Sequence, residues 1–412
     1  MTIPQLIALE KKRQQETLMM IPSENYTYPE VRQAVGSMLM HKYSEGYAHK
    51  RYYQGNKYVD EIEDLAVSAA KKLFFVPYAN VQPYSGSPAN AAVYFGLLRP
   101  GDKIMGLKLS GGGHLTHGHP TITFSGKYYR STQYDVEPDG TIDYHKLADL
   151  AEKEKPNLIV SGTTAYPRIL DWQQFAKIAD NIGAILMADI SHIAGLVVAG
   201  VHPSPVSYVH VVTTTTHKTL RGPRGALILV TEKGLKLDPK MGEKIDKAVF
   251  PGLQGGPHNN STAGIAIALE KASQKPFIRY GQAIVSNAKV LAGELIKSGF
   301  KIATGGTDNH LMVADARPFG IDGKTLAISL EEAGIIVNAN TIPHDPNPPF
   351  RPSGIRLGTP AVTTRGMKIS EMKRVAEWIS LVAKTKGQDK KVIKNIRSQV
   401  KSLCRRFPVD LS

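Results

Sequence analysis

The chain has 412 residues, of which 42% are hydrophobic and 21% are charged, a composition typical of a globular protein with two or three domains. It contains no uncharged apolar run of about 18 residues, and its first residues lack the pattern of a signal peptide, so we expect no membrane span and no secretion signal. The single cysteine, Cys404, excludes an internal disulfide and favours a cytoplasmic location.

The first 51 residues predict an N-terminal arm, with a short helix followed by an irregular segment rich in Tyr and Gly. From residue 52 to 273 we expect a large domain, because short apolar runs alternate with helical patterns and so indicate a buried, mostly parallel sheet with helices on both faces. The apolar runs are residues 102–107, 157–162, 184–189, 210–216 and 226–230, and the helical patterns are residues 58–74, 86–98 and 171–183.

Residues 274–412 predict a smaller α+β domain at the C-terminus. We expect helices over 277–299 and 324–334, strands over 301–306, 310–316 and 335–340, and two closing helices. Much of the net charge of +15 lies in the last of these, where nine Lys and Arg residues between 384 and 406 face one acid, Asp389. Its apolar residues recur at helical spacing, so a helix with a solvated basic face is favoured over a patch that binds nucleic acid.

The stretch SGSPAN, residues 85–90, opens a helical run. Small residues before a helix leave backbone N–H groups free, which makes a site suited to phosphate. The alternative is an ordinary helix start in which Ser87 is the capping residue.

Asp189 and Lys218 end two successive apolar runs that predict strands. In parallel sheets of this kind, active sites lie at the carboxyl ends of the strands. Each residue alone has an ordinary explanation, but a phosphate site, an acid for a ring nitrogen and a lysine that forms a Schiff base are together the parts that pyridoxal phosphate needs.

Two further loops carry candidate ligands. His114 and His117 lie in the Gly-rich stretch 111–119 without a third residue at metal-binding spacing, so we expect no metal and expect His114 to stack on a planar ring. Arg356 lies among small residues, and an arginine binds a carboxylate through two parallel hydrogen bonds. We also expect a neighbouring cation such as Arg224 to lower the pKa of Lys218.

Taken together, the motifs resemble the serine hydroxymethyltransferase family. The matching stretches are SENYT, KRYYQG, NVQPYSGS, GGHLTHG, AGLVVAGV, VVTTTTHKTLRGPRG, FPGLQGGP, GGTDNHL and SGIRLGTPA. The resemblance runs from about residue 5 to the C-terminus. It implies a fold-type I enzyme that uses pyridoxal phosphate to move the hydroxymethyl group of L-serine to tetrahydrofolate, giving glycine and methylenetetrahydrofolate. It also implies a cytoplasmic homodimer whose active sites are shared between subunits.

The resemblance assigns the cofactor residues as follows. Lys218 forms the internal aldimine, Asp189 pairs with the pyridine nitrogen, and His114 stacks on the ring. The other cofactor residues that it implies are Thr164 and His192 near the ring oxygen, Ser85, Gly86 and Ser87 at the phosphate, Thr215 and His217 beside the lysine, and Tyr43 and Gly256 from the partner subunit.

For the substrates, the resemblance implies that Arg356 binds the serine carboxylate with help from Ser23 and Tyr53. Glu45, from the partner subunit, is the implied acid–base group beside the serine hydroxyl and the folate. The remaining folate residues that it implies are Tyr52, Leu109, Gly112, Gly113 and Asn340.

Several positions depart from the family pattern without removing a catalytic group: Pro88, Gly111, Thr164, Arg351 and Pro352. Of these, Gly111 and the 351–352 loop lie on the expected folate side. An aldolase with the same cofactor and no folate step is the alternative enzyme, and a non-enzymatic basic binding protein is the alternative outside enzymes. Glu45, Asn340 and the 109–113 loop favour the folate enzyme. We do not expect a nucleic-acid partner.

Overall fold

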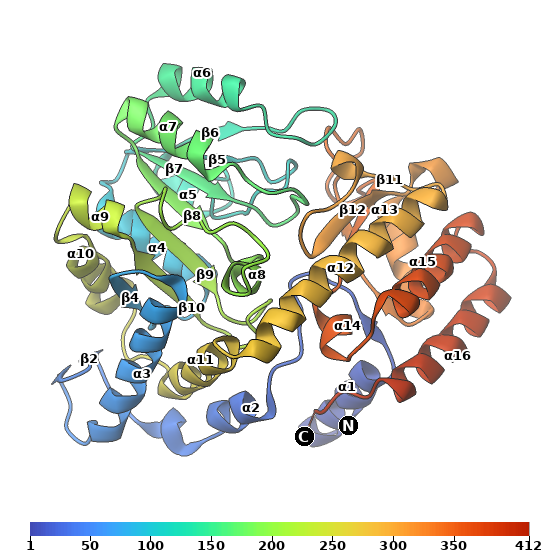
Figure 1. The fold of residues 1–412 in the computed structure, drawn as a ribbon, viewed down its shortest axis with the longest axis horizontal. Helices are drawn as coiled ribbons and strands as arrows, with labels where there is room; N and C mark the ends of the chain where they lie inside the picture. Colours follow the sequence, from blue (N-terminus) through green and yellow to red (C-terminus); the bar gives the residue numbers. More distant parts are fainter. Residues whose placement is uncertain (412) are drawn as a thin grey trace.

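Two β-sheets organise the chain in the computed structural model, which describes residues 1–411 (Figure 1). The larger sheet has seven strands in the order β4-β10-β9-β8-β7-β5-β6. All neighbours from β9 to β6 pair in parallel, and β10 pairs antiparallel with both β9 and β4. The strands are β4 (Tyr78–Asn80), β5 (Lys103–Leu107), β6 (Arg130–Tyr134), β7 (Leu158–Gly162), β8 (Ile185–Asp189), β9 (Val211–Thr215) and β10 (Ala226–Val230).

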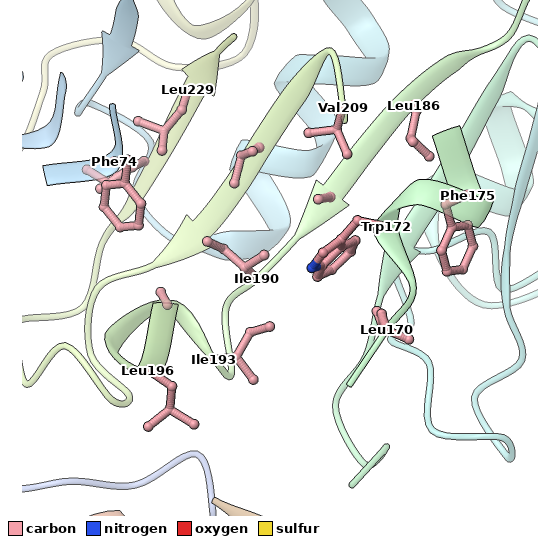
Figure 2. Close-up of a cluster of buried hydrophobic side chains, with 14 of the residues drawn as sticks. Phe74, Leu170, Trp172, Phe175, Leu186, Ile190, Ile193, Leu196, Val209 and Leu229 are labelled. Carbon is pink, nitrogen blue, oxygen red and sulfur yellow. The ribbon is translucent and has the colours of Figure 1, made fainter. Parts of the chain in front are cut away.

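Helices cover both faces of this sheet. Successive side chains of a strand point to opposite faces, so each strand contributes to two apolar clusters, one on each face. Along β10, Leu227 and Leu229 join one cluster while Ile228 and Val230 join the other. The first cluster, part of which Figure 2 shows around Trp172 and Ile190, includes residues of α3 (Lys57–Phe74), α6 (Tyr144–Glu154), α7 (Trp172–Ile182), α8 (Ala194–Val198) and α11 (Asn259–Ala272). The second includes residues of α4 (Gly86–Leu97) and α10 (Met241–Lys247).

A four-stranded antiparallel sheet in the order β11-β12-β15-β14 forms the second unit. Its strands are β11 (Lys301–Ile302), β12 (Leu311–Asp315), β14 (Asn338–Asn340) and β15 (Gly354–Gly358). Helices α13 (Gly323–Glu332), α15 (Ile369–Lys384) and α16 (Lys390–Arg406) contribute to its apolar core, and the long α12 (Lys275–Lys297) spans the two units in Figure 1.

The N-terminal segment packs on this second unit before it reaches the first. After α1 (Ile3–Gln15), strand β1 (Leu18–Met19) pairs in parallel with β13 (Ile335–Ile336), and Leu18 lies in the core of the smaller unit. The first and last helices lie close together in Figure 1. Lys401 of α16 forms an ion pair with Glu16, which follows α1. The remaining short elements are α2 (Pro29–Val35), β2 (Gly46–Tyr47), β3 (Lys50–Arg51), α5 (Phe124–Tyr128), α9 (Glu232–Leu237) and α14 (Pro360–Thr364).

The structure confirms the α/β class, the mostly parallel sheet with helices on both faces and the smaller α+β part. It corrects two predicted strands. Residues 335–340 form two separate strands, β13 and β14, in different sheets, and only residues 301–302 of the predicted strand 301–306 are extended, because a 3-10 turn follows. The sequence reading also missed β6, β15 and several helices, among them α6, α10 and α11. No helix within residues 1–411 is both long and apolar enough to cross a bilayer.

The register of the parallel strands explains where functional side chains gather. Gly162, at the end of β7, pairs with Asp189 at the end of β8, and Asp189 pairs with Thr213 of β9. The carboxyl ends of these strands therefore meet at one edge of the sheet, which faces the smaller unit.

Candidate active site

A cavity of about 400 Å³ opens at these strand ends. This volume suits a small-molecule site. It is lined by Ser23, Ser85, Gly86, Ser87, Leu109, His114, Leu115, Thr163, Thr164, Asp189, Ser191, His192, Thr215, His217, Lys218, Arg224 and Arg356. The structure thus brings together residues that lie far apart in the sequence and that the sequence had singled out separately.

The start of α4 forms one wall of the cavity. Ser85 is the N-cap residue in an extended conformation, and its side chain makes no capping hydrogen bond, so the alternative in which Ser87 caps the helix is wrong. A Cβ atom at Gly86 would lie 2.8 Å from Cγ2 of Thr215, so only glycine fits there without a shift. The first turn of α4 therefore offers unshared backbone N–H groups beside small side chains, as an anion site requires.

Asp189 is held by a dense set of hydrogen bonds. Asn90 and His117 each contact Oδ2, at 2.9 and 3.0 Å, and the Ser191 hydroxyl donates to Oδ1 at 2.6 Å. Burial alone would raise the pKa of Asp189, but hydrogen bonds from His117 and Asn90 outweigh it and hold that pKa well below the ordinary value. Asp189 is therefore an anion in this cavity.

Lys218 follows β9 and donates to Oγ1 of Thr215 at 2.7 Å. Burial lowers the pKa of Lys218 to about 8; the Asp189 carboxylate acts in the opposite direction, and Arg224 and Arg356 lower that pKa further. The expectation that a cation near Lys218 lowers its pKa is confirmed, with burial as the larger cause.

Three histidines that line the cavity are neutral. Burial lowers the pKa of His114 to about 4 and that of His217 to about 3, and it lowers the pKa of His192 well below the ordinary value. Lys218 lowers all three further. The His114 ring is oriented by a 2.7 Å hydrogen bond between its Nδ1 and the Thr116 hydroxyl.

Arg356 comes from β15 of the smaller unit and reaches across to the larger one. Its Nη1 donates to the Thr164 carbonyl at 2.6 Å, and its Nε donates to the Asn338 side chain at 3.1 Å. Burial lowers the pKa of Arg356 to about 10, so it remains a cation at neutral pH. Within residues 1–411 it has no carboxylate partner, which leaves its charge available to a ligand.

Five of the predicted site residues lie outside the cavity and near one another. Glu45 Oε1 lies 3.3 Å from the position of a Cβ at Gly255, and the Tyr43 ring lies 3.4 Å from the position of a Cβ at Gly256. Tyr43 also contacts Tyr53, with 5.2 Å between ring centroids. The fifth residue, Tyr52, is 73% exposed and donates its backbone N–H to the Glu45 carbonyl.

Apart from Glu45 and Tyr52, the predicted folate residues lie in or beside the cavity. Leu109 lines the cavity itself, whereas Gly112 and Asn340 line a smaller pocket beside it. Gly113 lies beside the cavity as well, because its carbonyl accepts a 2.7 Å hydrogen bond from the hydroxyl of Thr164, which lines the cavity.

The model of the serine hydroxymethyltransferase family matches residues 1–379. The serine hydroxymethyltransferase of Acidothermus cellulolyticus is 52% identical, with 99% of this chain and 95% of the relative covered, and that of Sorangium cellulosum is 53% identical, with 98% and 94% covered.

The chain belongs to the serine hydroxymethyltransferase family. It is an enzyme that converts serine and tetrahydrofolate to glycine and methylenetetrahydrofolate, and the family uses pyridoxal phosphate as its cofactor.

The residues of this serine hydroxymethyltransferase fit pyridoxal phosphate. The cavity combines the glycine-lined start of α4 for a phosphate, the anionic Asp189 for a protonated ring nitrogen and the buried amine of Lys218. Beside the lysine, Nδ1 of His217 is buried and has no hydrogen-bond partner within residues 1–411. These groups match the charged and polar parts of the cofactor.

Sequence reasoning missed the residues that hold Asp189 in place, which are Asn90, His117 and Ser191. One signal was present. Asn90 follows Gly86 by four residues, so it lies on the same face of α4 as the phosphate-site glycine. His117 had been considered only as a metal ligand with His114, and its contact with Asp189 depends on two segments 72 residues apart.

Proposed function

We propose that the cavity carries out the hydroxymethyl transfer with the residue roles that follow. The cofactor phosphate binds at Ser85, Gly86 and Ser87, Asp189 pairs with the ring nitrogen, and His114 stacks on the ring. Thr164 and His192 meet the ring oxygen, and Thr215 and His217 support Lys218. The meeting of Asp189, Lys218 and the start of α4 in one cavity is the observation that carries this proposal.

The bound cofactor supplies an electron sink for the bond that is broken in serine. The protein must supply a neutral amine, an anion opposite the ring nitrogen and a dry pocket. Lys218 meets the first need because its lowered pKa of about 8 leaves a neutral fraction at neutral pH. Asp189 meets the second because its hydrogen bonds hold it as an anion.

Arg356 binds the substrate carboxylate, with Ser23 beside it in the cavity. Tyr53, which lies with Tyr43 outside the cavity of its own chain, reaches the carboxylate from a second copy of the chain. Its fixed hydrogen bonds to Thr164 and Asn338 orient the guanidinium toward the cavity before any ligand arrives. A buried, oriented arginine loses little freedom when it binds, which favours affinity for a carboxylate.

Glu45 is the acid–base group for the serine hydroxyl, and it acts from the partner subunit of a homodimer. Among the residues that line the cavity, Asp189 is the only carboxylate, and it is already bound by Asn90 and His117. The cavity in one chain thus lacks a second acid. Glu45, Tyr43 and Gly256 lie together outside it, which supports a second copy placing them in its neighbour's site.

Tetrahydrofolate lies between Glu45, Tyr52, Leu109, Gly112, Gly113 and Asn340. Leu109, which lines the cavity, and the hydrogen bond from the Thr164 hydroxyl to the Gly113 carbonyl support this position. We further propose a cytoplasmic location and a division into an arm (1–51), a large domain (52–273) and a small domain (274–412). The separate apolar cores of the two sheets support two domains, with the change of core inside α12, where Ile284 joins the large core and Ala288 the small one. The pairing of β1 with β13 supports an arm that packs on the small domain.

The test is serine cleavage with and without tetrahydrofolate in wild-type protein, Lys218→Ala and the control Lys236→Ala, which changes an exposed lysine on α9. We expect glycine formation that depends on tetrahydrofolate, lost in Lys218→Ala and unchanged in Lys236→Ala. Equal rates of serine cleavage without tetrahydrofolate would overturn the proposed folate site. A fully active Lys218→Ala would overturn the role of that lysine.

A further inference from the structure

A pair of buried histidines joins the two sheets at the cavity. His192 follows β8 of the large sheet and lines the cavity, and His310 directly precedes β12 of the small sheet. Nδ1 of His192 lies 3.3 Å from Nε2 of His310, and the ring centroids are 5.5 Å apart. His310 is fully buried and His192 is 4% exposed. His310 does not line the cavity, so it can act on a ligand only through His192.

Both rings are neutral. Burial is the main cause that lowers the pKa of His192, and Lys218 and Arg356 lower it further. Burial, followed by Arg356 and His202, lowers the pKa of His310 to about 3. A neutral imidazole carries one proton, so one nitrogen donates and the other accepts. In the hydrogen bond between the rings, one histidine must therefore donate and the other must accept.

The second ring nitrogen of His310 decides the direction. Its Nδ1 is buried and has no hydrogen-bond partner within residues 1–411. If His192 donated, His310 would carry its proton on Nδ1, and that N–H would be a buried donor without an acceptor. If His310 donates from Nε2, its Nδ1 is only an unused acceptor. Buried donors without partners are rarer in proteins than buried acceptors without partners, so the second arrangement is favoured.

We propose that His310 is a positioning residue that donates from Nε2 to Nδ1 of His192 and so fixes the tautomer of His192. Because Nδ1 of His192 accepts this hydrogen bond, its proton lies on Nε2, the ring nitrogen left for a molecule in the cavity. His192 is then a hydrogen-bond donor to a ligand oxygen and not a base. This role rests on the proposed function only for the identity of that oxygen.

The tautomer of His192 then depends on the contact between the two units. The backbone of His310 is held in the small unit by a hydrogen bond from the Thr359 N–H to its carbonyl, and the His192 carbonyl accepts from Thr219 in the large unit. The two imidazoles meet only when these units are packed as in the structure. A correctly docked small sheet is thus required for His192 to present its N–H.

The direct test is ¹⁵N NMR of the full-length chain with labelled histidine, with cofactor bound and after its removal. The chain has 13 histidines, so the His192 signals are assigned by their loss in His192→Gln. The chemical shifts separate protonated from unprotonated ring nitrogens. We expect an unprotonated Nδ1 and a protonated Nε2 in His192 under both conditions. A protonated Nδ1 would overturn the proposal, whether or not the chain binds its cofactor.

Two substitutions separate positioning from packing. In His310→Gln the side-chain amide can replace the N–H donor, whereas His310→Leu fills space without one. We expect His192 to keep its tautomer in His310→Gln and to become a mixture in His310→Leu. We also expect kcat to fall roughly five- to tenfold in His310→Leu, as for one lost neutral hydrogen bond, with a smaller change in the KM for serine and recovery in His310→Gln.

His202→Gln is the matched control. His202 is a buried histidine close to His310, but its Nδ1 contacts the Pro203 carbonyl at 3.0 Å and not His192. We expect this variant to leave the tautomer of His192 unchanged. An equal loss in His310→Gln and His310→Leu, with an unchanged His192 tautomer in both, would show that His310 contributes only packing. In that case the proposal fails while the proposed function stands.

Discussion

The surroundings of Lys218 lower the pKa of its amine. Burial and the cations Arg224 and Arg356 lower its pKa to about 8, although Asp189 acts against them. The same desolvation keeps the nearby histidines uncharged. A lysine in this state reacts as an amine at a pH where an exposed lysine is almost entirely protonated.

This state predicts a pH dependence for loading the cofactor. A lowered pKa means that the neutral amine appears at lower pH, so the rate of loading pyridoxal phosphate into cofactor-free protein should rise about tenfold per pH unit below the pKa and level off above it. The midpoint should lie at about pH 8. The measurement is the visible absorbance of the bound cofactor against time at each pH.

Arg224→Gln sharpens this prediction, since it removes a cation that lowers the pKa of Lys218. The midpoint should move to higher pH in this variant. Arg99→Gln, which changes an exposed arginine remote from the cavity, should leave the midpoint in place. A midpoint near the value of a free lysine in the wild-type protein would contradict the account of Lys218.

At the scale of elements, the anion site depends on how closely the start of α4 approaches the end of β9. A Cβ at Gly86 would meet Cγ2 of Thr215 at 2.8 Å, so the glycine is required by a contact between two elements and not by its own backbone angles. Because Oγ1 of Thr215 also accepts from Lys218, the same threonine links the anion site to the lysine.

Gly86→Ala should therefore weaken binding of pyridoxal phosphate roughly ten- to hundredfold, as overpacking at a close contact does, while the chain still folds. Thr215→Ser removes Cγ2 and keeps the hydroxyl, so the double variant Gly86→Ala/Thr215→Ser should regain most of the affinity. Titration with the cofactor measures each dissociation constant, with Thr215→Ser alone as the control. If the double variant binds no better than Gly86→Ala, the contact with Cγ2 is not the reason for the glycine.

The elements that local patterns could predict are those with strong periodicity. The helical patterns predicted α3, α7 and α12, over residues 58–74, 171–183 and 277–299. The apolar runs predicted the buried strands that end at Asp189 and Thr215. Residues 335–340 were read as one strand because their pattern is continuous. Their split arises from pairing with β1 in one direction and with β15 in the other, which local sequence does not encode.

The same distinction applies to the candidate site. Residues on motifs with their own chemistry, such as Lys218 and Arg356, were found from the sequence and from the family resemblance, and they do line one cavity. Asn90, Ser191 and His310 were not found, because their importance lies in contacts with Asp189 and His192 across distant segments. A single sequence does not indicate which distant residue an amide, a hydroxyl or an imidazole will contact.

At the scale of the whole molecule, a single carboxylate among residues 1–411 lines the cavity of one chain. The cavity contains Lys218, Asp189 and Arg356, whereas Glu45 lies elsewhere on the same chain. If Glu45 has the acid–base role proposed above, we expect a homodimer in which each subunit completes the site of the other. In such a homodimer, the two halves of a site can be inactivated on different chains.

Mixing two inactive variants, Lys218→Ala and Glu45→Ala, tests this claim most directly. Random reassociation at equal concentrations gives heterodimers with one intact site, so we expect about a quarter of wild-type activity. In the control mixture of Lys218→Ala with Asp189→Ala, both changes lie on the half-site supplied by one chain, so neither heterodimer site is intact and no activity should return. Recovery in the first mixture alone is the expected result. If heterodimers form and the first mixture is no more active than its parents, the shared active site is contradicted.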